Sequence, residues 1–226
     1  MLFRSVYEAG FSGFWAQRTL EKQGVTCKVI HPADVPSTDK ERQQKTDKVD
    51  CRRLSLSLKE DRMEGIYIPS EQQVNDRDIL RARQQLVKDQ TRCKNRISSM
   101  LDFYGIPIPP GYKESSHFSK RFIGWLEALD LSESAKVSLQ LKLGSLNGIR
   151  GQLLVANRHI NKMDKSPQYK DSVELLRSIP GIGLLNAMIF LTELGDIKRF
   201  NAFDKLCSYV GLTPNVYSSA ETTPVT

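Results

Sequence analysis

The sequence predicts an α/β unit followed by a largely helical remainder. Three observations indicate this: strand-like and helix-like segments alternate over residues 1–70, an apolar stripe of period seven follows, and a compact apolar segment begins at Asp171. Alternating strands and helices are typical of a largely parallel sheet, and a period of seven is typical of a coiled coil. We therefore predict the fold class α/β plus α, with domains over 1–70, 71–170 and 171–226.

The first domain is expected to hold short strands with helices between them. The segments Met1–Val6, Val25–Ile30 and Gly65–Ile68 are apolar or β-prone and predict strands. Helical spacing of apolar residues predicts helices over Phe11–Gln23 and Thr46–Leu58. A sheet this small is not a stable domain by itself, so we expect the beginning of the domain to be missing.

The middle domain is predicted to be two long helical stretches. The first runs from Ser70 to Gly105 and ends at the proline-rich segment Ile106–Gly111, and the second covers Phe118–Met163. Its heptad stripe consists of Ile79, Leu86, Cys93 and Met100. The stripe is imperfect, yet it predicts a coiled coil and, through it, a homo-oligomer.

Composition and charge favour a polyanionic partner. The 226 residues include 33 basic and 26 acidic side chains, which give a net charge of +7 and a pI near 9.2. Many soluble proteins are mildly basic without binding nucleic acid, so composition leaves both interpretations open. No apolar run approaches the roughly 18 to 20 residues of a membrane helix, and the four cysteines are scattered without a C-x-x-C pair. We expect a cytoplasmic protein with no membrane contact.

Positive charge is concentrated on the first long helix. Residues 77–96 carry seven basic side chains against Asp78 and Asp89. The candidates for nucleic-acid contact there are Arg81, Lys88, Arg92 and Arg96. A solvated helix face is the alternative, and it is about equally compatible with the sequence.

Asp47 and Asp50 are the first candidates for chemistry. Three residues apart at the start of a predicted helix, they share a face. Paired carboxylates suit Mg²⁺, which binds carboxylate, water and phosphate oxygens, and paired metal ions can hold the two oxygens of a phosphodiester exchange. Taken alone, the pair is better explained as acids in a first helical turn behind the N-cap Thr46.

The turn Pro180-Gly181-Ile182-Gly183 lies between two apolar helical segments, as in a helix-hairpin-helix. Its glycines allow a tight turn, and backbone N–H groups at the start of the second helix can hold a DNA phosphate. A plain corner between two packed helices is the alternative. We favour phosphate binding because this turn exposes its donors.

These segments, in this order, resemble the insertion-sequence transposases that combine a RuvC-like Asp-Glu-Asp-Asp site with a C-terminal recombinase serine, also named bridge-RNA-guided recombinases. The resemblance spans essentially the whole chain. The matching segments are Tyr7–Gly10, Lys45–Cys51, Tyr67–Pro69, the Pro180–Gly183 turn, Arg199-Phe200, Gly211–Pro214 and Tyr217–Ala220.

The resemblance implies roles for individual residues. Glu8, Asp47 and Asp50 match three of the four carboxylates of a Mg²⁺ site in an RNase H-like (RuvC-like) domain, and Ser219 matches the serine that forms a covalent phosphoserine link with DNA. It also implies DNA as substrate, a structured guide RNA as partner and a multimeric assembly.

Three departures from the family pattern bear on activity. The family's first Asp precedes the Glu segment and has no counterpart here, and Ala220 replaces the glycine after the serine. The basic, glycine-containing stretch that follows the serine in the family is replaced by Glu221–Thr226. We therefore expect a chain truncated at both ends, with little or no recombinase activity of its own. Two other functions remain open: a non-catalytic DNA- or RNA-binding protein, and a structure-specific nuclease that uses the carboxylates without Ser219.

Overall fold

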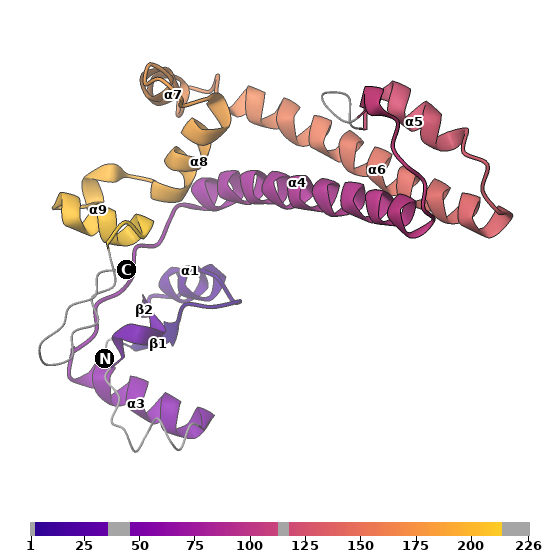
Figure 1. Cartoon of the computed structure of the whole chain (residues 1–226). Coiled ribbons are helices and arrows are strands. Elements are labelled where there is room, and N and C mark those ends of the chain that lie inside the picture. The colour runs from indigo at the N-terminus through magenta and orange to yellow at the C-terminus, as the bar shows by residue number, and fades with distance from the viewer. Residues whose placement is uncertain (1–2, 36–45, 113–117, 214–226) are drawn as a thin grey trace, which may run out of the picture. The chain divides into compact units, whose positions relative to one another are not determined.

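The computed structural model describes residues 3–35, 46–112 and 118–213. The chain divides into two units, Met1–Ser70 and Glu71–Thr226, whose elements are labelled in Figure 1. The first unit holds a small parallel sheet with helices, and the described part of the second is helical. This agrees with the predicted class, α/β plus α.

The first unit is built on a β–α–β segment. Strand β1 (Arg4–Glu8), helix α1 (Trp15–Lys22) and strand β2 (Thr26–Ile30) follow one another, and the strands pair in parallel from Arg4 opposite Thr26 to Glu8 opposite Ile30. Helix α1 ends before Gly24, whose φ of 80° is the left-handed conformation that glycine adopts at low cost. The first two predicted strands and the helix between them are thereby confirmed.

Helix α3 (Asp47–Lys59) completes the unit by contacting β1. A small apolar core forms from Ile30, Val35 and Met63, against which Leu54 and Leu58 of α3 pack. A short 3₁₀ helix, Pro32–Asp34, follows β2. The core positions α3 so that its first turn lies near the end of β1.

The third predicted strand, Gly65–Ile68, is wrong: the segment is extended but forms no ladder. A single backbone bond joins it to the sheet, from Ile66 N–H to the carbonyl of Val29 at 2.7 Å. Pro69 has no N–H to continue a ladder, and its carbonyl accepts from Arg18 Nη2 at 2.8 Å instead of from a strand. One bond is too few to define a strand.

The second unit is organised around two long helices. Helix α4 (Glu71–Phe103) and helix α6 (Glu133–Met163) run antiparallel and side by side (Figure 1), since Arg83 bonds Asn157 near one end and Cys93 bonds the carbonyl of Lys142 further along. In the sequence, α5 (Lys120–Glu127) comes between these two helices. The remaining elements are α7 (Lys170–Arg177), α8 (Leu184–Leu194), the 3₁₀ helix Ile197–Arg199 and α9 (Phe203–Val210).

The apolar face of α4 differs from the predicted heptad stripe. Its buried apolar residues are Leu80, Cys93, Ile97 and Leu101, of which the last three repeat every four residues. Every fourth residue lies on one face of a helix, and α6 of the same chain covers this face of α4. The packing partner is therefore intramolecular, and oligomerisation through this helix stays a prediction.

Two apolar clusters lie at opposite ends of the α4–α6 pair. One joins Ile97, Phe122 of α5 and Leu146 of α6. The other joins Leu80, Ile160, Val173 of α7 and Met188 of α8. The second cluster draws residues from both the predicted middle domain and the predicted C-terminal domain. No helix in the described part of the chain is both long and apolar enough to cross a membrane.

Candidate functional site

Glu8 occupies the carboxyl end of β1, opposite Ile30 in the parallel register. The chain then turns. Gly13 N–H closes the turn on the carbonyl of Gly10 at 3.1 Å, Ala9 N–H donates to the carbonyl of Ile30 at 2.8 Å, and the Tyr7 hydroxyl donates to the carbonyl of Gly13 at 2.8 Å. The carboxyl ends of parallel strands are where α/β sheets present ligand-binding groups. Glu8 is therefore placed as expected for a functional carboxylate.

Asp47 and Asp50 lie in the first turn of α3. Thr46 caps this helix, since its Oγ1 accepts from Val49 N–H at 3.3 Å, which confirms the capping role that the sequence indicates. The two carboxylates differ in environment: Asp47 is exposed and Asp50 is half-buried. A cap and a ligand site are compatible, because the cap uses the Thr46 hydroxyl and neither carboxylate.

Arg53 brings Glu8 and Asp50 together. Its Nη2 lies 3.6 Å from Oε1 of Glu8 and 3.3 Å from Oδ1 of Asp50, with 17% of the arginine side chain exposed. Both distances exceed the usual length of an N–H···O hydrogen bond, so charge attraction holds this cluster. The Arg53 Nε atom is buried and has no hydrogen-bond partner.

The donor set fits a divalent cation in part. Two carboxylates from different elements converge on a positive group, and carboxylate oxygens are the ligands that Mg²⁺ prefers. Among the described residues, Asp47 forms no ion pair with Arg53. No three His, Cys, Asp or Glu side chains of these residues gather closely enough to hold a metal ion. The three-carboxylate site of Glu8, Asp47 and Asp50 stays a prediction.

The predicted hairpin consists of α7, the turn 178–183 and α8. Gly181 has a φ of 89°, which requires glycine, and Ile182 N–H closes the turn on the carbonyl of Ile179 at 3.1 Å. Gly183 is the N-cap of α8 and no side chain caps the helix there. A Cβ at Gly183 would meet nothing within 4 Å. The first N–H groups of α8 therefore have no side-chain cap, which is the arrangement that a phosphate contact at a helix start needs.

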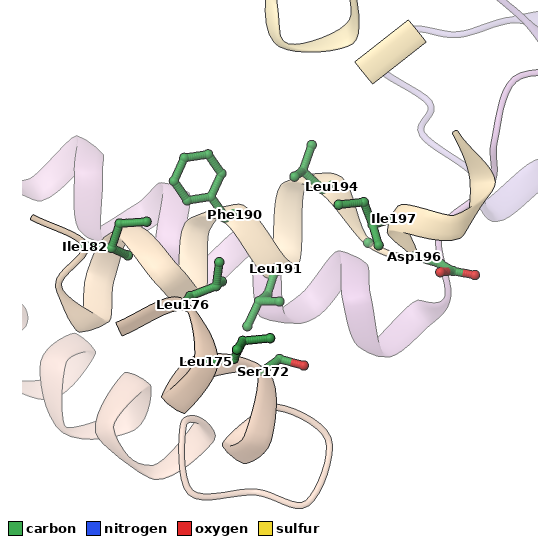
Figure 2. Close-up of a pocket in the computed structure, with 10 residues that line it drawn as sticks. Ser172, Leu175, Leu176, Ile182, Phe190, Leu191, Leu194, Asp196 and Ile197 are labelled. Carbon is green, nitrogen blue, oxygen red and sulfur yellow. The ribbon is translucent and has the colours of Figure 1, made fainter. Parts of the chain in front are cut away.

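An apolar pocket of about 460 Å³ lies along the same helix pair. Figure 2 shows that its lining extends from Ile182 in the turn, along Phe190 and Leu194 of α8, to Ile197, with Leu176 of α7 opposite. Apolar walls offer no charge complement to phosphate. The pocket walls are therefore not a phosphate site, although Ile182 of the lining belongs to the turn that is predicted to contact phosphate.

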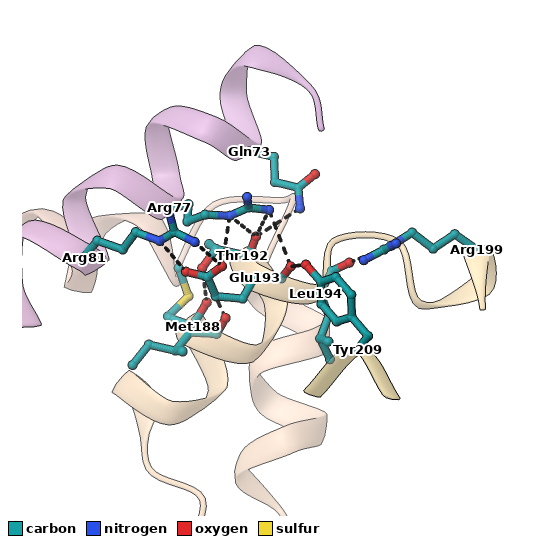
Figure 3. Close-up of polar contacts among 10 residues, drawn as sticks. Gln73, Arg77, Arg81, Met188, Thr192, Glu193, Leu194, Arg199 and Tyr209 are labelled. Atoms are coloured by element: carbon teal, nitrogen blue, oxygen red, sulfur yellow. Dashed lines mark hydrogen bonds and ion pairs between the residues drawn. The ribbon is translucent and has the colours of Figure 1, made fainter. Parts of the chain in front are cut away.

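Cationic and amide side chains of α4 cap the opposite end of α8 (Figure 3). Gln73 Nε2 donates to the carbonyl of Thr192 at 3.0 Å, and Arg77 donates to the same carbonyl through Nε and Nη2 at 3.2 and 3.1 Å. The Tyr209 hydroxyl of α9 donates to the carbonyl of Glu193 at 3.1 Å. These donors satisfy carbonyls that a helix end leaves without intrahelical partners.

The four basic candidates on α4 have unequal surroundings. Arg81 forms a two-pronged ion pair with Glu193, at 2.7 and 2.8 Å, and Arg92 pairs with Asp89 at 2.9 Å. Lys88 and Arg96 are exposed and have no hydrogen-bond or ion-pair partner among the described residues. Lys88, Arg92 and Arg96 follow one another at intervals of four and form a ridge.

Comparison with known proteins identifies two family segments. Residues 6–106 match a transposase model of the IS110 type with a DEDD domain, and residues 173–224 match the model described as "Transposase IS116/IS110/IS902 family". The chain belongs to the IS110/IS116/IS902 family of transposases. The first match contains Glu8, Asp47 and Asp50, and the second contains the hairpin turn and Ser219.

Two relatives illustrate the breadth of the match. The transposase for insertion sequence element IS1533 of Leptospira borgpetersenii is 30% identical over 222 residues, which cover 90% of this chain and 60% of the relative. The transposase for IS1111A of Coxiella burnetii is 26% identical over 214 residues, which cover 93% and 56%. The chain spans little more than half the length of the curated relatives that it matches.

Ser219 lies outside the described residues. Sequence reasoning missed Arg53, Gln73 and Arg77 as organising side chains. Arg53 carries one signal that could have indicated it, because it lies three residues after Asp50 on a helix and such pairs are neighbours. The contacts of Gln73 and Arg77 with Thr192 join residues more than a hundred positions apart, so no local pattern announces them.

Proposed function

We propose that this chain carries DNA-binding and phosphodiester-transfer elements of an insertion-sequence transposase. The observation that carries the proposal is the convergence of Glu8, at the end of a parallel strand, and Asp50, in the first turn of α3, on one positive group. The two family matches support it, because they cover both of the segments that contain the expected site residues. We also propose that the first unit is part of an RNase H-like (RuvC-like) domain.

In this proposal Glu8, Asp47 and Asp50 hold Mg²⁺, which when bound would polarise a DNA phosphate and stabilise developing charge on its oxygens. Asp47 supplies an exposed carboxylate next to the Glu8–Asp50 pair along the chain. The three side chains would bind and orient the ion through their carboxylate oxygens.

Ser219 is the proposed nucleophile. Its Oγ would attack the phosphorus atom, the bond to one deoxyribose oxygen would break, and that sugar would leave as a hydroxyl with the proton from the serine. The product is a phosphoserine ester that conserves the energy of the broken bond for later joining.

DNA contact is assigned to two places. The uncapped start of α8 behind Pro180–Gly183 would receive a backbone phosphate, and the ridge on α4 would neutralise further phosphates. A structured guide RNA and a second copy of the chain are proposed partners on the strength of the resemblance.

Covalent capture tests the catalytic part. Labelled double-stranded DNA fragments of varied sequence are incubated with the protein and MgCl₂, and protein–DNA adducts are separated on a denaturing gel. Because little activity is expected of this chain, we expect an adduct in low yield that Ser219→Ala and Asp50→Asn both abolish, with Ser218→Ala as the matched control that retains it. An adduct that survives Ser219→Ala, or no adduct from the unaltered chain, would refute the assignment of the chemistry. Strand cleavage without an adduct would favour a nuclease.

A further inference from the structure

We propose that Arg53 is a positioning residue that occupies the cation position between Glu8 and Asp50 and must leave it before a divalent metal can bind there. The proposal rests on the proposed metal-dependent function. It concerns the arginine itself, which no sequence motif singles out.

The first observation is the shared contact. A single atom, Nη2 of Arg53, forms ion pairs with both carboxylates, at 3.6 Å from Glu8 and 3.3 Å from Asp50. Mg²⁺ binds carboxylate oxygens at about 2.0 to 2.1 Å. A metal ion shared by these two carboxylates would therefore lie close to Nη2, and the guanidinium carries a permanent like charge that opposes its binding.

The second observation is that Arg53 is incompletely bonded. Strong arginine–carboxylate pairs use two parallel N–H···O bonds, whereas Arg53 offers one nitrogen to two residues and its Nε is buried with no acceptor. An unsatisfied buried donor carries a free-energy penalty. The arginine is therefore held weakly enough for a metal ion to replace it. Its charge still offsets the repulsion between the two carboxylates.

Arg53 then has two consequences for the metal. It preorganises Glu8 and Asp50 on either side of one point, and it makes binding competitive, so that metal affinity is lower than the two carboxylates alone would give. A released guanidinium is a good ligand for a phosphate, which would let DNA and metal together displace it.

Metal binding is the test, with Mn²⁺ as the probe and the full chain as the protein. Free Mn²⁺ is measured by electron paramagnetic resonance for the unaltered chain, Arg53→Gln, Arg53→Lys and Arg52→Gln. Arg52 is an exposed neighbour on the same helix, so its substitution removes the same formal charge from outside the cluster. We expect Arg53→Gln to bind Mn²⁺ roughly tenfold more tightly, and Arg53→Lys and Arg52→Gln to bind as the unaltered chain does.

A second measurement follows metal binding in the unaltered chain, uses Arg53→Lys only for assignment, and covers the case in which Arg53→Gln fails to fold. The Arg53 Nε–H resonance of the unaltered chain, assigned by its absence from Arg53→Lys, should shift as MgCl₂ is added. Binding of Mn²⁺ with equal affinity by the unaltered chain and Arg53→Gln, or a resonance that stays in place while metal binds, would overturn the role of Arg53 and leave the metal site standing. No binding by any folded variant would overturn both.

Discussion

The hydroxyl of Tyr169 donates a 2.6 Å hydrogen bond to Oδ2 of Asp76, joining the start of α7 to α4 across 93 positions of sequence. Asp76 is 5% exposed, and its other oxygen accepts from Gln72 Nε2 at 2.8 Å. A carboxylate is thus buried inside the helical unit with a partner for each oxygen. Such a group stabilises the fold only while its partners remain.

Tyr169→Phe should therefore lower the free energy of unfolding. Removing the hydroxyl leaves Oδ2 of Asp76 buried without its donor, at a cost of about 1 to 3 kcal/mol. Urea unfolding followed by circular dichroism measures the change, and Tyr104→Phe at an exposed tyrosine is the matched control. Equal unfolding free energies for Tyr169→Phe and the unaltered chain would show that the bond contributes nothing.

The same tyrosine predicts a pH dependence. Burial, followed by the hydrogen bond and the negative charge of Asp76, raises the pKa of Tyr169 well above its usual value. The unfolded tyrosine ionises near pH 10, while the folded one stays protonated. Ionisation therefore stabilises only the unfolded state, and the free energy of unfolding falls as pH rises. The stability difference between the unaltered chain and Tyr169→Phe should be complete below about pH 10 and should narrow above it. A constant difference up to pH 11 would contradict the assigned direction.

Arg77 and Arg81 should contribute unequally to the free energy of unfolding, although both pair with Glu193 from the same helix. Arg77 is 16% exposed and serves the carbonyl of Thr192 as well, whereas Arg81 is 59% exposed. Arg77→Ala should cost about 1 to 3 kcal/mol, and Arg81→Ala less than about 1 kcal/mol. Chemical unfolding of both variants at low and high salt checks this, and only the Arg81 effect should fade with salt. A larger loss for Arg81→Ala would reverse the assignment.

Gly195→Ala should destabilise the end of α8. Gly195 has φ 65° and ψ −135°, a conformation that costs an L-residue about 1 to 3 kcal/mol, and its added Cβ would also collide with the Gln73 side chain. Thermal unfolding of Gly195→Ala, Gln73→Ala and the double variant separates the two causes. Compared with Gln73→Ala, the double variant should lose only the backbone cost, because the Gln73 side chain is no longer there to collide. Equal stability of Gln73→Ala and the double variant would mean that the backbone conformation is not strained.

Lys88 and Arg96 should contribute more to DNA binding than Arg81. They are exposed without partners among the described residues, while the charge of Arg81 is already compensated by Glu193. Lys88→Ala or Arg96→Ala should weaken binding to double-stranded DNA and reduce the slope of log affinity against log salt by about 1. Fluorescence anisotropy across a salt series measures both. An unchanged slope in either variant would remove the ridge from the interface.

The elements of this fold were predictable where local chemistry determines them. Thr46 fixes the start of α3 through its own cap and Gly24 marks the end of α1, so these bounds follow from the sequence. The strand expected over Gly65–Ile68 fails because a ladder depends on a partner, and only Ile66 finds one. The predicted stripe on α4 was displaced because α6, a distant segment, decides which side of α4 is buried.

The candidate site shows the same division. The helical start at Asp47 and Asp50 follows from spacing, and Glu8 follows from its position after a β-prone segment. The role of Arg53 does not, because its contact with Glu8 depends on how α3 packs on β1. An interaction between residues 45 positions apart needs the tertiary structure before it can be recognised.

The carbonyl cap of α8 has a mechanical consequence. Gln73 and Arg77 fasten the last turn of α8 to the beginning of α4, and Tyr209 fastens it to α9. The other end of α8 carries no side-chain cap, but Leu184 and Leu185 there pack against the apolar cluster of Leu80, Ile160 and Met188, so both ends of α8 are held by the rest of the helical unit. A force on Gly183, such as the pull of a bound DNA strand, would therefore be transmitted along α8 to the beginning of α4, where Gln73 and Arg77 hold its last turn.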